Sequence, residues 1–107
     1  MEGGCDDILT NPPYKYAKEF VVKSLELLRE GCRCYMFLKL QFLEGVARYN
    51  EIFSATPPKS VYVFKKRILC AKNGEFERMK EGGGSAVAYA WFVWQKGYNN
   101  PTTISWI

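Results

Sequence analysis

The sequence predicts one α/β domain over residues 1–107, built on a partly parallel sheet. At the start of the chain, strand-like apolar runs alternate with a helical pattern, which favours parallel strands joined by right-handed crossovers. The last two strand-like runs have no helix between them, which indicates an antiparallel edge. With 107 residues, 48% of them hydrophobic, the chain can bury one core.

The first half of the chain supplies the elements expected to be parallel. Residues 6–10 form a short strand, which ends at Asn11 because the two prolines that follow carry no amide hydrogen for a sheet ladder. Residues 15–30 form a helix that ends at Gly31, placed as a left-handed residue. Residues 34–40 are almost continuously apolar, which favours a parallel strand covered on both faces. The expected buried face of the helix contains Ala17, Phe20, Val21, Ser24, Leu25, Leu27 and Leu28.

The second half begins with a shorter helix over residues 44–53, which ends before Pro57-Pro58. Residues 60–64 form a strand rich in β-branched and aromatic side chains. Residues 65–85 are a charged loop of a length that is often functional, and its final Gly-Gly-Gly-Ser is a hinge rather than a phosphate loop. Two strands follow, over residues 87–94 and 102–107. We expect core packing more than base stacking from Tyr89, Trp91, Phe92 and Trp94.

The composition excludes several kinds of site. Fifteen Lys and Arg against 11 Asp and Glu give only a mild preference for polyanions. The chain has no histidine, which removes Ser-His and Cys-His nucleophile pairs and His-containing zinc sites. The cysteines are expected to be reduced thiols without a metal, with a disulfide or metal site as the alternative; they are Cys5, Cys32, Cys34 and Cys70. No leader or bilayer-length apolar run is visible, so we expect a cytoplasmic protein without a membrane partner.

The segment Asn11-Pro12-Pro13-Tyr14 is the candidate catalytic site. In open α/β sheets, ligands bind beyond the carboxyl ends of the strands, which is where this segment falls. The side-chain oxygen of Asn11 and the carbonyls of Asn11 and Pro12 can accept hydrogen bonds from a planar amine, and Tyr14 offers a ring for stacking. Such acceptors favour a pyramidal, nucleophilic nitrogen without a histidine base. The alternative is a surface turn without catalytic function, in which Tyr14 only packs against the core. The strand before the segment and the helix after it disfavour this interpretation.

Residues 7–14 resemble the catalytic motif of amino-group methyltransferases that use S-adenosylmethionine, in the Asn form typical of adenine-N6 DNA methyltransferases. Residues 36–45 and 82–94 extend the resemblance to small phage-borne members, over essentially the whole chain. The resemblance implies the C-terminal, target-base half of a Rossmann-like methyltransferase sheet, with S-adenosylmethionine as cofactor and DNA as partner. It implies that Asn11 and Pro12 bind the target amine and that Tyr14 stacks on a flipped base. The cleft beside them would be lined by Lys39, Gln41, Phe42 and Glu44.

The family binds its cofactor with a Gly-rich turn and an acidic residue that both precede Asn-Pro-Pro-Tyr, whereas here only ten residues precede Asn11. We therefore expect a natural remnant, part of a split enzyme or a truncated product, without tight cofactor binding or methylation by the chain alone. The strand over residues 6–10 should leave an unpaired edge for the missing half or for self-association.

Two points stay open at this stage. Lys65, Lys66 and Arg67 are candidate contacts to the DNA backbone, with a solvated loop as an equal alternative. The function alternatives are a methyltransferase acting on RNA or on protein glutamine, and a non-catalytic module that binds DNA or protein.

Overall fold

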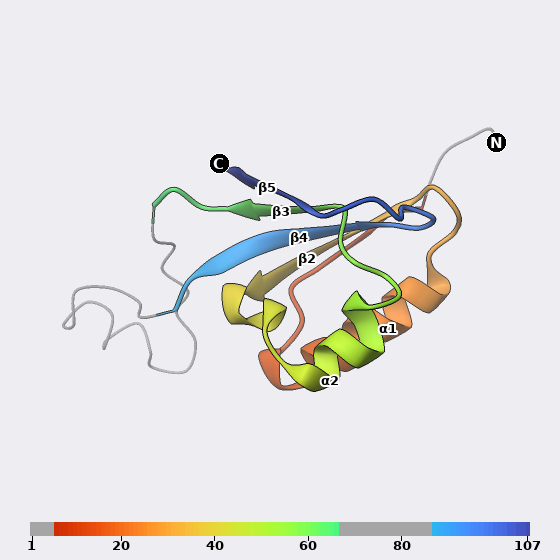
Figure 1. Ribbon diagram of the computed structural model, residues 1–107, viewed down its shortest axis with the longest axis horizontal. Coiled ribbons are helices and arrows are strands. Elements are labelled where there is room, and N and C mark those ends of the chain that lie inside the picture. The colour runs from red at the N-terminus through yellow and green to blue at the C-terminus, as the bar shows by residue number, and fades with distance from the viewer. Residues whose placement is uncertain (1–5, 67–86) are drawn as a thin grey trace.

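The computed structural model describes residues 6–66 and 87–107, and in this part five strands form one mixed α/β sheet in the order β1-β2-β4-β3-β5 (Figure 1). All the strands and helices expected from the sequence are present. Their bounds are β1 Ile8–Thr10, a 3-10 turn η1 Tyr14–Tyr16, α1 Ala17–Leu27, β2 Arg33–Lys39, a 3-10 turn η2 Leu40–Leu43, α2 Val46–Arg48, a π-helical turn η3 Tyr49–Phe53, β3 Ser60–Val63, β4 Tyr89–Gln95 and β5 Thr103–Trp106.

The parallel pairing at the start of the chain agrees with the sequence prediction, but the antiparallel pairing involves other strands than predicted. β1 pairs with β2 in parallel, as expected for a strand-helix-strand unit. The predicted antiparallel edge is wrong, because β4 lies inside the sheet and runs antiparallel to both β2 and β3. The outer strand β5 is parallel to β3. The strongly apolar β4 gains neighbours on both sides in this arrangement, whereas all four residues of β5 are exposed and suit an edge.

Both helices cover the same face of the sheet (Figure 1), and the core lies between them and the strands. Alternate residues of the strands point into it, because side chains of a strand alternate between its faces. The core residues on the sheet are Cys34, Met36 and Leu38 of β2, Ala90, Phe92 and Trp94 of β4, and Val61 of β3. The indole of Trp94 donates a hydrogen bond to the carbonyl of Thr56 at 2.8 Å, so its polar atom is satisfied.

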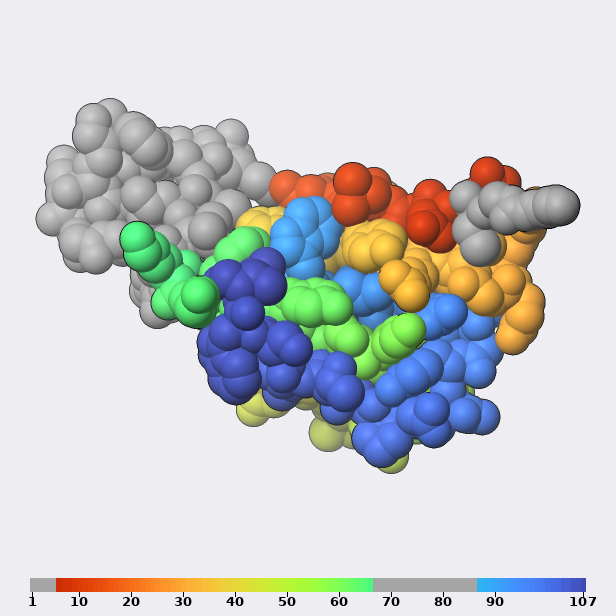
Figure 2. All heavy atoms as spheres, turned by 90° about the horizontal axis from the view of Figure 1, so that it is seen from above, coloured from red at the N-terminus to blue at the C-terminus, as the bar shows by residue number. Residues whose placement is uncertain are grey.

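The opposite face of the sheet, seen in Figure 2, has no described helix on it. The expectation that residues 34–40 are covered on both faces is therefore not met in the described part of the chain. Tyr35 and Phe37 of β2 are half-buried on this face, where Phe37 packs against Tyr89 at 5.1 Å and Trp91 at 5.3 Å between ring centroids. Of the four aromatic residues expected in the core, Phe92 and Trp94 are buried there, whereas Tyr89 and Trp91 are on the open face.

Helix α1 buries a narrower stripe than its sequence predicts. Ala17, Val21, Ser24 and Leu28 are buried, at the spacing of one helical face. Phe20 and Leu27, which were expected in the core, are 42% and 65% exposed. Their positions in the helix place them to one side of the buried stripe.

Helix α1 ends at Leu27, earlier than the predicted end at Gly31, because the backbone of Leu28 is already extended, with φ −69° and ψ 136°. Gly31 lies in the turn that follows the helix. Gly31 has a φ of 83°, which confirms its prediction as a left-handed residue, and its amide donates to the carbonyl of Lys96 at 3.0 Å. The second helix is only a short α-helical segment that continues as the π-helical turn η3, and the chain leaves it before Pro57. Cys32 and Cys34 are buried free thiols.

Some expectations fall on residues that the structure does not describe. Cys5, Cys70, Arg67 and the Gly-Gly-Gly-Ser segment lie outside the described residues. Within residues 6–66 and 87–107, no group of three or more His, Cys, Asp or Glu side chains is placed to hold a metal ion. No helix of the same residues is both long and apolar enough to cross a membrane.

Candidate functional site

The Asn11-Pro12-Pro13-Tyr14 segment follows the carboxyl end of β1 directly. Pro12 is buried, whereas Asn11 and Pro13 are exposed. Pro13 has φ −59° and ψ 133°, and its carbonyl accepts a hydrogen bond from the amide of Tyr16 at 2.9 Å, which closes the 3-10 turn. The two prolines, one buried and one exposed, restrict the backbone of the segment. The Asn11 side chain stays on the surface beyond the end of β1, which is where ligands bind in open α/β sheets.

Asp7 fixes the position of the start of β1 relative to β2. The amide of Arg33 donates to the Asp7 carboxylate at 2.8 Å, which ties the beginning of β1 to the beginning of β2. The register continues to Thr10 opposite Met36, so the two strands point their carboxyl ends toward the same edge of the sheet. Residues that follow β1 are therefore placed beside residues that follow β2.

Tyr14 is held by two side chains from the end of β2 and the turn after it. The ammonium of Lys39 lies 4.3 Å from the centroid of the Tyr14 ring, a cation–π contact. The Nε2 of Gln41 donates a hydrogen bond to the Tyr14 hydroxyl at 3.2 Å. Tyr14 itself is half-buried and packs against the core. The structure thus brings together three of the side chains that the sequence analysis assigned to one cleft.

The other two expected cleft residues behave differently. Phe42 is 1% exposed and packs edge-on against Phe53 and Phe92, each at 5.9 Å between ring centroids. It is therefore mainly a core residue, and the small exposed part of it lines the cavity beside Tyr14. Glu44 has an exposed side chain, and it is its backbone carbonyl that accepts a hydrogen bond from the guanidinium of Arg48.

A cavity of about 340 Å³ opens beside Tyr14, between the start of α1 and α2. Arg48 lies 5.2 Å from the centroid of the Phe42 ring and donates to the Phe42 carbonyl at 2.9 Å. Lys18 forms an ion pair at 3.0 Å with Glu51 of η3. Three of the lining residues are cationic and one is acidic; the lining is Tyr14, Lys15, Lys18, Glu19, Phe42, Ala47 and Arg48.

Sequence reasoning missed the cationic lining of this cavity. Lys15 and Lys18 could have been found, because they follow Tyr14 directly and a spacing of three residues places them near one another on a helix. Arg48 gives no such local signal, since its place depends on how α2 packs against Phe42. Lys18 is paired with Glu51, so Lys15 and Arg48 are the cations of this lining that suit an anionic group such as a phosphate.

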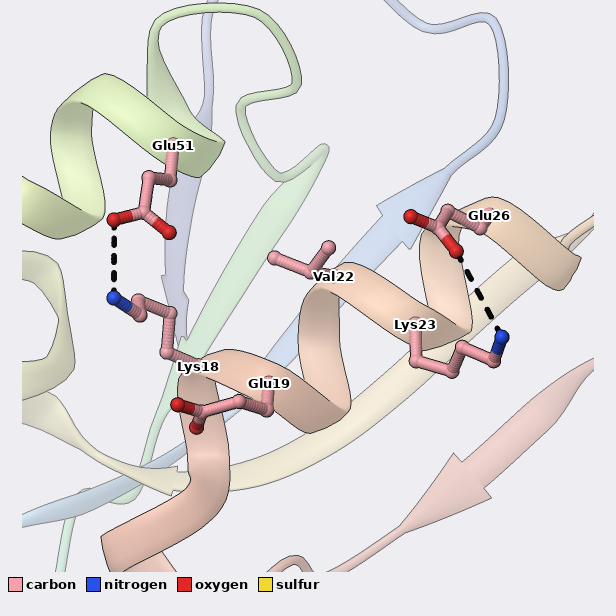
Figure 3. A pocket seen from close by; sticks show the side chains of 6 residues that line it. All are labelled: Lys18, Glu19, Val22, Lys23, Glu26 and Glu51. Carbon is pink, nitrogen blue, oxygen red and sulfur yellow. Dashed lines mark hydrogen bonds and ion pairs between the residues drawn. The ribbon is translucent and has the colours of Figure 1, made fainter.

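A second cavity, of about 350 Å³, lies further along α1 (Figure 3). Its cations are engaged by carboxylates: Lys18 by Glu51 at 3.0 Å, and Lys23 by Glu26 at 3.9 Å. The remaining lining residues are Glu19 and Val22. Because it carries three carboxylates and its lysines are paired, this cavity suits an anion less well than the one beside Tyr14.

Lys65 and Lys66 follow β3 and are exposed. β2 and β3 are both antiparallel to β4 and therefore run in the same direction. Their carboxyl ends lie at the same end of the sheet, so these lysines are at the end of the sheet where Tyr14 lies. The amide of Lys65 donates to the carbonyl of Ile107 at 2.8 Å, which fixes the backbone there.

The buried thiol of Cys34 is not a reactive group of this site. Burial raises its pKa from 9.0 to about 11, and a hydrogen bond with Ser24 only partly opposes this. The thiolate that would act as a nucleophile or metal ligand is therefore disfavoured at neutral pH.

Comparison with known proteins adds little to these observations. No protein-family model matches the sequence, and no curated protein matches it. Among solved structures, the chain is similar to the crystal structure of the M1.HpyAVI–SAM complex, with a TM-score of 0.46 and 14% sequence identity. The similarity covers 94% of this chain and 55% of that one, so the chain spans about half the length of the solved protein.

Proposed function

We propose that this chain supplies the target-base pocket of an adenine-N6 DNA methyltransferase. The observation that carries the proposal is the Asn11-Pro12-Pro13-Tyr14 segment at the carboxyl end of β1, with Asn11 exposed and Tyr14 held in place by Lys39 and Gln41. The segment resembles the catalytic motif of amino-group methyltransferases, and its position beyond the carboxyl end of β1 supports the proposal.

In the proposed site, Asn11 and the carbonyl of Pro12 accept hydrogen bonds from the exocyclic amine of adenine. The amine of a conjugated ring is a poor nucleophile because its lone pair is delocalised into the ring. Acceptors for its hydrogens return electron density to the nitrogen and favour the pyramidal geometry of attack. Tyr14 stacks on the base and orients it, so that positioning rather than a protein base carries the step.

Cations near this site favour a nucleic acid over a neutral substrate. Lys15, Lys18 and Arg48 line the cavity beside Tyr14, and Lys65 and Lys66 lie exposed at the same edge of the sheet. Phosphates provide most of the affinity of proteins for DNA through such contacts. A glutamine side chain, the substrate of the protein-directed alternative, offers neither a ring to stack on Tyr14 nor a phosphate.

The described residues do not fit S-adenosylmethionine itself. The cofactor carries a sulfonium cation, and the cavity beside Tyr14 places three cationic side chains against one carboxylate. In this proposal we therefore expect calorimetric titration of the chain with S-adenosylmethionine to give no micromolar binding.

Base recognition can be tested with adenosine and N6,N6-dimethyladenosine, which lacks amine hydrogens. We expect adenosine to bind more tightly in an NMR titration, because the dimethyl compound cannot donate to Asn11. A neutral hydrogen bond contributes about 0.5–1.5 kcal/mol, so the preference should be about 2- to 12-fold. Asn11→Ala should reduce this preference while adenosine still shifts the Tyr14 ring signals.

The matched control is Asn50→Ala, because Asn50 is an exposed asparagine on η3 and forms no part of the Asn-Pro-Pro-Tyr segment. It should leave the preference unchanged. Equal binding of the two nucleosides by the unaltered chain would refute amine recognition and favour a non-catalytic nucleic-acid-binding module. Preferential binding of a glutamine-containing peptide would refute the adenine proposal in favour of a protein substrate.

A further inference from the structure

Lys39 and Gln41 contact different parts of Tyr14. Gln41 donates to the hydroxyl at 3.2 Å, at the tip of the side chain, and so fixes where the ring points. Lys39 places its ammonium 4.3 Å from the ring centroid and so occupies one face of the ring. The first contact is compatible with a base stacked on the ring. The second is not compatible with a base on the same face.

Two other cations near Tyr14 are held by oxygen atoms, whereas Lys15, like Lys39, lies over a tyrosine ring, 5.5 Å from the centroid of Tyr16. Lys18 is ion-paired with Glu51, and the guanidinium of Arg48 is held by the backbone carbonyls of Phe42 and Glu44. Within residues 6–66 and 87–107, the Tyr14 ring is the contact that Lys39 makes, and no carboxylate is paired with it. A lysine ammonium on a flexible four-carbon stem can exchange such a contact for a new one.

We propose that Lys39 covers the face of Tyr14 while the site is empty, and that an entering adenine displaces it toward the phosphate of the same nucleotide. Lys39 is then a positioning residue: it opposes binding of a base without a phosphate and favours binding of a nucleotide. Gln41 keeps the ring in place during the exchange. This inference rests on the proposed function, because it takes the ligand of Tyr14 to be a base.

The first test is a ¹H–¹³C NMR spectrum of the chain as it is. The ε-methylene group of Lys39 is bonded to the ammonium that lies 4.3 Å from the Tyr14 ring centroid, so we expect the ring current to shift its protons upfield. Adding adenosine should return them toward the position of an ordinary lysine as the Tyr14 ring signals change. This measurement needs no variant and therefore does not depend on the folding of one.

The second test is Lys39→Met, which keeps an unbranched stem and removes the charge. A cation–π contact at an exposed site corresponds to about a 2- to 5-fold effect, so adenosine should bind about 2- to 5-fold more tightly to the variant. Adenosine 5′-monophosphate should lose affinity relative to adenosine, because the displaced ammonium no longer meets the phosphate.

Lys59→Met is the matched control, because Lys59 also lies over a tyrosine ring, 5.8 Å from the centroid of Tyr98. Lys59 precedes β3 and so lies at the opposite edge of the sheet from Tyr14. This substitution should change neither nucleoside nor nucleotide affinity at Tyr14.

The possible failures are distinguishable. Adenosine that shifts the Tyr14 signals while the Lys39 signals stay upfield would mean that the base uses the other face of the ring; the inference fails and the proposed function stands. Weaker adenosine binding by Lys39→Met would mean that Lys39 contacts the base directly, which also overturns the inference. No effect of adenosine on Tyr14 would overturn both.

Discussion

Replacing Phe42 by Ala should destabilise the whole fold rather than impair a ligand contact. Phe42 is 1% exposed, packs edge-on against Phe53 and Phe92, and lies under the guanidinium of Arg48. Full burial of a phenylalanine side chain contributes about 1.5–3 kcal/mol, and each aromatic pair adds about 0.5–1.5 kcal/mol. Together with the cavity left behind, we expect a loss of about 3–5 kcal/mol in the free energy of unfolding. Domains of this size have only about 5–15 kcal/mol in total.

The assay is urea unfolding followed by tryptophan fluorescence, since Trp94 is buried in the same core. Phe42→Leu is the control, because it retains most of the buried apolar volume and should cost much less than Phe42→Ala. If Phe42 acts only through stability, the folded molecules of Phe42→Ala still bind adenosine. The amount of adenosine bound then falls only in proportion to the fraction of the variant that is unfolded. The reasoning is refuted if Phe42→Ala loses less than about 1 kcal/mol yet no longer binds adenosine, since that result would make Phe42 a ligand-binding residue.

Three further predictions concern the thiol, the helix end and the sheet edge. Because the pKa of Cys34 is raised in the folded state, the neutral thiol stabilises the fold fully below about pH 9, and this stabilisation is lost as the pH rises toward 11. The free energy of unfolding should therefore fall over this interval by about 2–3 kcal/mol more than it falls in Cys34→Ala. Urea unfolding at each pH measures both proteins. Gly31→Ala should cost about 1–2 kcal/mol in the same assay, because φ is 83° and an added Cβ would meet no atom within 4 Å, so that backbone strain alone contributes. If the free edge of β1 mediates self-association, Leu9→Lys should shift sedimentation toward the monomer, since Leu9 is 71% exposed on that edge strand and a charge there opposes strand pairing. A concentration-independent monomer for the unaltered chain would contradict the last of these.

Local sequence patterns predict the elements well, and the reason is visible in β2. Its nearly continuous apolar run identifies a strand, but which of its residues face the core and which face the open side appears only in the structure, where they alternate. The position of β4 between β2 and β3 could not be predicted, because nothing local specifies which non-consecutive strands pair. The burial of Phe42 could not be predicted for the same reason, since Phe92, one of the rings that bury it, is fifty residues further along the chain.

The grouping around Tyr14 was predictable because it depends on one rule. The carboxyl ends of parallel neighbouring strands lie at the same edge, so residues after β1 and after β2 had to meet. Which contacts they form was beyond the sequence. Nothing in the order of residues indicates that Lys39 covers the ring of Tyr14 or that Gln41 binds its hydroxyl.

The apolar residues that α1 leaves exposed lie on the same side of the molecule as the free edge of the sheet. With about 100° of rotation per residue, Phe20 and Leu27 fall on one line along the helix, roughly opposite to Lys18. Lys18 points to η3, with which it pairs through Glu51, so this apolar line faces away from η3. α1 connects β1 to β2, and η3 belongs to the crossover from β2 to β3; the flank of α1 away from η3 is therefore the β1 side. The apolar line of α1 therefore lies beside the edge of β1 that no described strand pairs with, whereas Leu9, in register with Tyr35, lies on the opposite, open face of the sheet.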